Sequence, residues 1–91
     1  MQNSFIIAPN PFSNSTAFQF SLKEPTHVKI DVYNVEGQLV KSLVNADLNA
    51  ASHSVTWNGQ DEAGKNVSSG IYFTKISTGK KSAVHKTMII R

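Results

Sequence analysis

Two neighbouring stretches decide the fold: HSVTWNGQDEAG at residues 53–64 and VSSGIYF at residues 67–73. In the first, His53, Val55 and Trp57 alternate with small hydroxyl residues, and this period of two is typical of a half-buried strand. Asn58-Gly59 then signals a turn, because glycine adopts a positive φ without steric cost and asparagine tolerates it well. The second stretch enters an aromatic strand. Together they predict two strands joined by a long, turn-rich loop.

The rest of the chain has the same organisation. Turn signals recur roughly every 8 to 12 residues, and no helical periodicity is sustained. In the segment 38–44, leucines and valines fall on both faces, so its inward face cannot be assigned, and residues 45–51 are predicted to be polar and irregular. The pattern predicts an all-β, immunoglobulin-like antiparallel β-sandwich of about seven strands. The expected strands cover residues 4–8, 16–22, 28–32, 38–44, 53–57, 71–77 and 82–90.

Size and composition exclude several classes of protein. The chain has 91 residues, enough for one small domain, and its lack of cysteine excludes disulfides and thiolate metal sites. A net charge of +3 without a basic run interleaved with aromatics argues against nucleic-acid binding. No apolar run approaches the ~20 residues that a membrane-spanning helix needs. We expect residues 1–8 to be a linker remnant or a first edge strand, and residues 9–91 to form the domain.

The chain offers no constellation of catalytic residues, and we expect neither a catalytic site nor a cofactor. Asp61 and Glu62 are adjacent carboxylates, which diverge on a strand or turn and make a poor acid–base pair. His27, His53 and His85 belong to different strands or strand starts and lack metal-ligand spacing.

Two binding hypotheses are secondary. Asn58 and Asp61 could supply oxygen ligands to calcium, which prefers such ligands, although the spacing of an EF-type loop is missing. A stacking platform for carbohydrate would use aromatic side chains, but about half of them are expected in the core, where burial stabilises each by a few kcal/mol. The aromatics considered are Tyr33, Trp57, Tyr72 and Phe73.

Most of the distinctive residues have structural explanations. Asn10 and Asp61 can accept hydrogen bonds from backbone amides two residues further on and so close turns. Trp57 offers a large apolar surface that can lie between sheets, with an N–H that needs a partner. Pro11, which precedes Phe12, favours an extended turn. Four glycines stand where a positive φ or a close approach of the backbone costs little: Gly37, Gly59, Gly64 and Gly70.

Four motifs in order resemble one family. They are the element Asn10-Pro11-Phe12, the segment VKIDVYNVEGQLV at residues 28–40, the deciding stretch at residues 53–73, and KTMIIR at residues 86–91. Together they resemble the type A C-terminal sorting domain of the type IX secretion system. They are equally similar to the immunoglobulin-like domain of the flagellar hook-capping protein. The likeness extends from about Ala8 to Arg91.

The resemblance to sorting domains implies a non-catalytic signal at the end of a larger secreted protein of Bacteroidota. Such a protein passes through the periplasm and the outer-membrane type IX translocon to the cell surface. There a sortase-like peptidase usually separates the domain from its N-terminal cargo domains. The implied recognition site is the last strand, whose edge a receptor would bind by β-augmentation. Its residues are Lys86, Met88, Ile89, Ile90 and Arg91.

Other functions stay open. The same domain could be a structural spacer or assembly module, as in hook-capping proteins, or a module that binds carbohydrate or calcium. A spacer would have sequence after it, whereas a sorting signal ends its chain.

Overall fold

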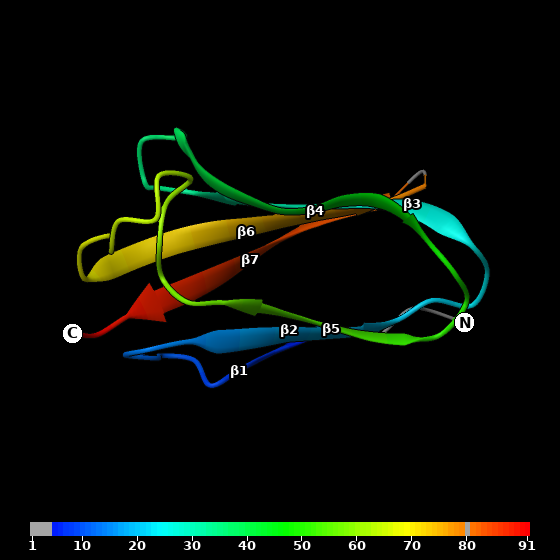
Figure 1. The fold of residues 1–91 in the computed structure, drawn as a ribbon, viewed down its shortest axis with the longest axis horizontal. Helices are drawn as coiled ribbons and strands as arrows, with labels where there is room; N and C mark the ends of the chain where they lie inside the picture. The colour runs from blue at the N-terminus through cyan, green and yellow to red at the C-terminus, as the bar shows by residue number, and fades with distance from the viewer. Residues whose placement is uncertain (1–4, 80) are drawn as a thin grey trace.

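The computed structural model describes residues 5–79 and 81–91, which fold into two layers of β-sheet (Figure 1). One sheet has three strands in the order β1-β2-β5 and the other has four in the order β4-β3-β6-β7, with antiparallel neighbours throughout. The predicted immunoglobulin-like sandwich is therefore confirmed. None of the described residues lies in a helix that could span a membrane. The strands are β1 (Phe5–Ala8), β2 (Thr16–Ser21), β3 (Thr26–Tyr33), β4 (Leu39–Leu48), β5 (Ser52–Trp57), β6 (Gly70–Thr78) and β7 (Lys81–Ile89).

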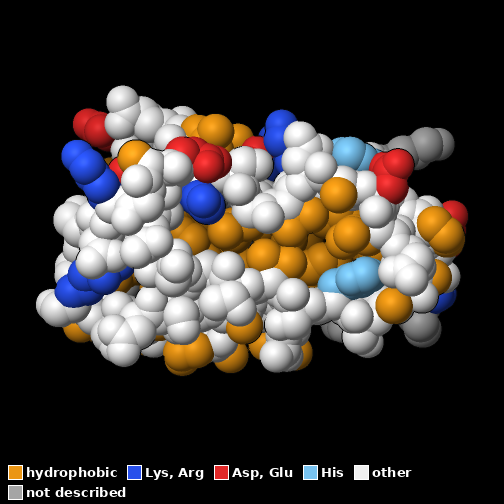
Figure 2. Space-filling view, viewed as in Figure 1, with side chains coloured by type: hydrophobic (Ala, Val, Ile, Leu, Met, Phe, Trp, Pro, Cys, Tyr) orange, Lys and Arg blue, Asp and Glu red, His pale blue; other side chains and the backbone are white. Residues whose placement is uncertain are grey.

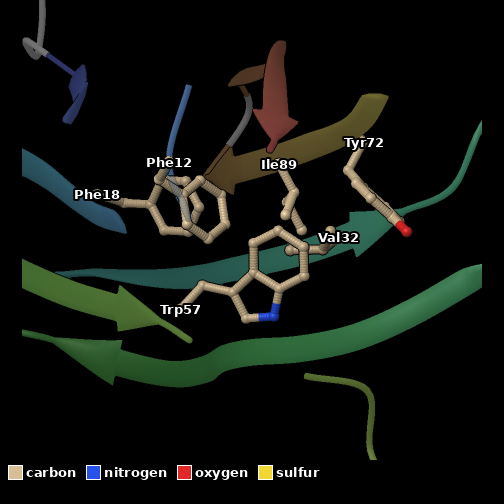
Figure 3. Packing of buried hydrophobic residues seen from close by; sticks show 6 residues of the cluster. All are labelled: Phe12, Phe18, Val32, Trp57, Tyr72 and Ile89. Carbon is tan, nitrogen blue, oxygen red and sulfur yellow. The ribbon is translucent and has the colours of Figure 1, made fainter. Parts of the chain in front are cut away.

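The apolar residues of alternate positions meet between the sheets in two clusters. Trp57 is fully buried in the first, with Phe12 and Tyr72 packed edge-on against it at centroid distances of 5.6 Å (Figure 3). The indole Nε1 donates to the carbonyl of Gln60 at 2.9 Å, so the N–H has the partner that its burial requires. The second cluster consists of Phe20, Leu22, Val28, Ile30 and Ile76.

The core reaches the surface along one side of the sandwich. Leu43 and Val44 of β4 and Val55 of β5 pack against the buried clusters but stay partly exposed. Figure 2 shows hydrophobic surface along the opening between these two strands, which are the edges of different sheets. The side is open because β4 and β5 each pair only within their own sheet.

The strand β4 departs from the prediction in its length. Residues 45–48, expected to be irregular, continue β4 and pair with Thr26–Lys29 of β3. The irregular interpretation was wrong because the polar residues here face outward, where Asp47 and Asn45 form hydrogen bonds with the ring of His27. The apolar Leu48 meanwhile packs against the second core cluster.

A β-bulge explains why the inward face of β4 could not be assigned from sequence. Val44 pairs with Ile30 and Ser42 pairs with Asp31, which leaves Leu43 as an extra residue. Leu43 and Val44 both contact the core as a result, although they are neighbours in sequence. A second register shift lies between Val32 and Tyr33. Tyr33 pairs with Leu39 as a result, and Leu39 is exposed.

Candidate functional site

The last strand, β7, lies at the edge of the four-stranded sheet beside β6. Its residues divide between two environments. Ile89 is 1% exposed and belongs to the core cluster around Trp57 (Figure 3). Lys86 and Ile90 are exposed, and Met88 is half-buried. The proposed recognition residues therefore do not form one exposed row, because alternate side chains of β7 point into the core.

The free edge of β7 is covered near the chain end by Asn10–Phe12, a segment that we call the clasp. The Asn10 side chain donates from Nδ2 to the carbonyl of Lys86 and accepts at Oδ1 from the amide of Met88, both at 3.0 Å. The Phe12 amide donates to the Met88 carbonyl at 3.0 Å, and the Phe12 carbonyl accepts from the Ile90 amide at 2.8 Å. A strand added at residues 86–90 would have to displace the clasp.

The chain end is tied to the loop that follows β5. The Arg91 Nη2 donates to the carbonyl of Gly59 at 2.7 Å, and the Arg91 amide donates to the hydroxyl of Ser69 at 2.9 Å. Gly59 has a φ of +69°, and a Cβ added to it would overlap the Arg91 guanidinium. Glycine at position 59 thus satisfies both the turn and the close approach of the last residue.

The two acidic residues of the same loop have structural partners. Asp61 Oδ1 accepts from the amides of Ala63 at 2.9 Å and Lys65 at 3.0 Å, which confirms its predicted role in a turn. Glu62 Oε2 accepts from the amide of Ser42 at 2.7 Å and so fastens the loop to the edge of β4. The described part of the chain contains no group of three or more His, Asp or Glu side chains that could hold a metal. Asn58 is exposed, and the calcium site stays a prediction.

The three histidines contact different partners. The exposed ring of His27 lies 2.7 Å from Asp47 Oδ1 and 2.6 Å from Asn45 Oδ1. These hydrogen bonds, first that with Asp47 and then that with Asn45, raise the pKa of His27 above its usual 6.5. His53 lies 2.9 Å from the Asn49 carbonyl, and His85 packs on the ring of Phe5. His53 also stacks on Phe20, whose ring centroid lies 6.2 Å from that of Phe5.

The aromatic residues separate as their pattern predicted. Trp57 and Tyr72 are buried, and the Tyr72 hydroxyl donates to the carbonyl of Ser68 at 2.8 Å. Tyr33 and Phe73 are half-buried and pair directly across β3 and β6, so they share the outer face of the four-stranded sheet.

A comparison with protein families identifies the family of this domain. The sequence profile of the FlgD Ig-like domain matches residues 10–82. The chain belongs to the FlgD Ig-like domain family. This confirms the family resemblance that the four motifs indicated. None of the curated protein sequences matches the chain.

Solved structures share the fold of this FlgD Ig-like domain at low sequence identity. Dimeric latent PorU from Porphyromonas gingivalis matches with a TM-score of 0.77 and 17% identity, over 97% of this chain and 9% of PorU. PorZ of the same organism, an essential bacterial surface component of its type IX secretion system, matches with a TM-score of 0.67 and 19% identity, over 97% of this chain and 12% of PorZ. FlgD from P. aeruginosa matches with a TM-score of 0.64 and 20% identity, over 96% of this chain and 70% of FlgD.

Sequence reasoning missed the clasp of this FlgD Ig-like domain. It identified Asn10, Pro11 and Phe12 as one motif and the chain end as another, but it did not join them. The turn predicted for Asn10 was wrong, because its Oδ1 accepts from the Met88 amide and the Phe12 amide donates to the Met88 carbonyl. The available signal was an amide side chain in a proline-bounded element, which can pair with a strand edge through both its donor and its acceptor.

Proposed function

We propose that this domain is a non-catalytic C-terminal signal that directs a larger protein through the type IX secretion system to the cell surface. The observation that carries the proposal is how much of PorU and PorZ the fold occupies. The match covers 97% of this chain but only 9% and 12% of those proteins. A fold of this size is therefore a small part of much larger proteins, and PorZ is a surface component of that system.

The proposed route follows the resemblance to sorting domains. Cargo domains N-terminal to the signal would cross the periplasm with it and meet the outer-membrane translocon. A sortase-like peptidase would then cut before the domain. The expected location is the cell surface or the extracellular space of a bacterium of the Bacteroidota.

The geometry of the chain end favours recognition of a folded domain over recognition of a linear tail. Thr87 and Ile89 are almost completely buried, at 0% and 1% exposure, so removing residues 86–91 would open the core. The clasp and the bond from Arg91 to Gly59 also hold the chain end against the domain. A receptor would thus meet Lys86 and Met88 as parts of a rigid surface.

A reporter fusion tests the proposal. The domain is fused to the C-terminus of a fluorescent protein that carries a signal peptide, and the fusion is expressed in a bacterium with a working type IX system. Accessibility to added protease measures the share of reporter at the surface. We expect surface reporter only in the strain with a working translocon. Reporter that stays in the periplasm of both this strain and a translocon-defective strain would contradict the proposal.

A structural assembly module is the second candidate. The match to FlgD from P. aeruginosa favours it, because the shared fold there makes up 70% of the matched chain and is not a small part of a large protein. A module of that kind would leave the reporter in the periplasm.

A further inference from the structure

The outer face of the four-stranded sheet carries an apolar patch that spans all four strands. Tyr33 of β3 pairs with Leu39 of β4 on one side and with Phe73 of β6 on the other. Directly opposed residues of antiparallel strands project from the same face, so these side chains form one row. The directly opposed pair Ile71 and Met88 adjoins this row, and Val84 lies further along the same face of β7, beyond Lys86. The members, which we call the outer patch, are Leu39, Tyr33, Phe73, Ile71, Met88 and Val84.

The edges of the outer patch are open to solvent. Leu39 is 54% exposed and Val84 is 60% exposed, whereas the four residues between them are half-buried by their neighbours. Apolar side chains gathered on the free face of a sheet mark contact sites. Aromatic side chains and methionine, both present here, are enriched in protein interfaces.

Two lysines lie among the residues of the outer patch. Phe73 pairs with Lys86, and Lys75 pairs with Val84. Neither lysine forms an ion pair with any of the described residues, whereas Lys29 lies 3.7 Å from Asp31. Asp31 of β3 pairs directly with Lys75 of β6, but it is only 5% exposed. Solvent and any partner therefore meet the positive charges of Lys75 and Lys86 first.

The outer face of the other sheet is different. Ile6, Gln19 and Ser54 form one of its rows, and the neighbouring rows contain alanine, serine and threonine, without a charged residue. The two faces therefore provide an internal comparison, in which only one combines aromatic residues with unpaired lysines.

The clasp limits which atoms of the chain end a receptor can contact. Because residues 86–90 already bond to Asn10 and Phe12 along their edge, a receptor that contacts Lys86 and Met88 meets them through their side chains on the outer patch. We propose that the outer patch is the docking surface for the export machinery, and that its partner is an apolar protein surface that also presents Asp and Glu carboxylates. This inference rests on the proposed sorting function. A second copy of the domain fits less well, because face-to-face docking would bring the lysines of both copies together.

Charge reversal in the reporter fusion tests the docking surface. The variant Lys75→Glu/Lys86→Glu places negative charge against the expected carboxylates and should lower the surface reporter by about tenfold or more. Its matched control, Lys23→Glu/Lys65→Glu, makes the same change in net charge at two exposed lysines of loops outside the patch. The control should export like the original domain.

A second pair of variants tests the apolar part. Leu39→Thr/Val84→Thr makes the exposed edges of the patch polar with residues that strands tolerate, and should lower surface reporter severalfold. Ile6→Thr is the control, because Ile6 is 56% exposed on the other sheet. The melting temperature of each purified fusion establishes that the domain is folded.

The outcomes separate the two proposals. Export lost by folded patch variants and kept by both controls supports the docking surface. Patch variants that are exported like the original domain would overturn it while leaving the sorting function intact. Failure of the original domain to export its reporter would overturn the sorting function and the docking surface together.

Discussion

Gly59 is the residue at which the deciding loop meets the chain end. An alanine there must adopt a left-handed conformation and displace the Arg91 guanidinium from the Gly59 carbonyl. Gly64 has a similar φ, +81°, and a Cβ added there would have nothing within 4 Å. We expect Gly59→Ala to lower the free energy of unfolding by about 1 kcal/mol more than Gly64→Ala, the value of one hydrogen bond. Urea denaturation measures both.

A double-mutant cycle shows whether the larger cost of Gly59→Ala comes from its contact with Arg91. In an Arg91→Ala background, Gly59→Ala should cost no more than Gly64→Ala, because only the shared cost of the left-handed backbone is left. An undiminished difference in that background would contradict the explanation.

His27 predicts a pH dependence of stability with a definite sign. Its bonds to Asp47 and Asn45 raise the pKa of the folded state above 6.5, so the folded domain binds the proton more tightly than the unfolded chain. The resulting stabilisation is fully present below the unfolded pKa and is lost as pH rises through the raised folded pKa. The melting temperature should therefore fall over this window, and His27→Gln should remove that fall.

NMR titration of the His27 ring gives the direct measurement. Its pKa should exceed 6.5 in the original domain and decrease in Asp47→Asn, which removes the negative charge of the main hydrogen-bond partner. A pKa at or below 6.5 in the original domain would be inconsistent with the hydrogen bonds to Asp47 and Asn45.

Asp61 is also the residue on which the calcium hypothesis depends. Its Oδ1 already accepts two backbone hydrogen bonds, and these account for the residue without a metal. We expect millimolar calcium to leave the melting temperature unchanged. A rise that is abolished by Asp61→Asn would instead establish a calcium site in this loop.

At the scale of elements, the clasp is the feature with the clearest consequence. Asn10→Ala removes two hydrogen bonds to β7 and should lower the free energy of unfolding by about 1–2 kcal/mol. Hydrogen exchange at the Met88 amide, which donates to Asn10 Oδ1, should accelerate. Asn14→Ala is the control, because Asn14 is an exposed residue of the same connection for which no side-chain hydrogen bond is found among the described residues. Equal exchange at Met88 in the two variants would show that the clasp does not protect the edge.

The elements themselves could be predicted to different degrees. Strands with clean alternation, such as the one with Phe18 and Phe20 on one face, followed from the sequence because their period is local. β4 did not, because its bulge at Leu43 depends on pairing with β3 and shifts the period within the strand. The polar end of β4 was missed for a related reason: Asn45 and Asp47 find their partner in His27, on another strand.

On the scale of the whole molecule, sequence patterns predicted the sandwich and the family but not the surfaces. The clasp joins Asn10 to residues 76 and 78 positions further along the chain, and no local pattern encodes such a contact. The outer patch is also non-local, since Tyr33, Phe73 and Lys86 become neighbours only through strand register. Of the recognition residues expected from the resemblance, Lys86 and Met88 lie at this patch, whereas Ile89 belongs to the core.

The most direct test of the central claim compares this domain with a domain of the same fold from a flagellar protein. Two fusions of one signal-peptide-bearing reporter would be expressed in the same type IX-competent strain, one ending in this domain and the other in the matching domain of FlgD from P. aeruginosa. Protease accessibility would give the share of each reporter at the surface. The account predicts surface reporter for this domain and only background for the FlgD domain. Equal background for both would contradict a sorting function and leave a structural module as the explanation.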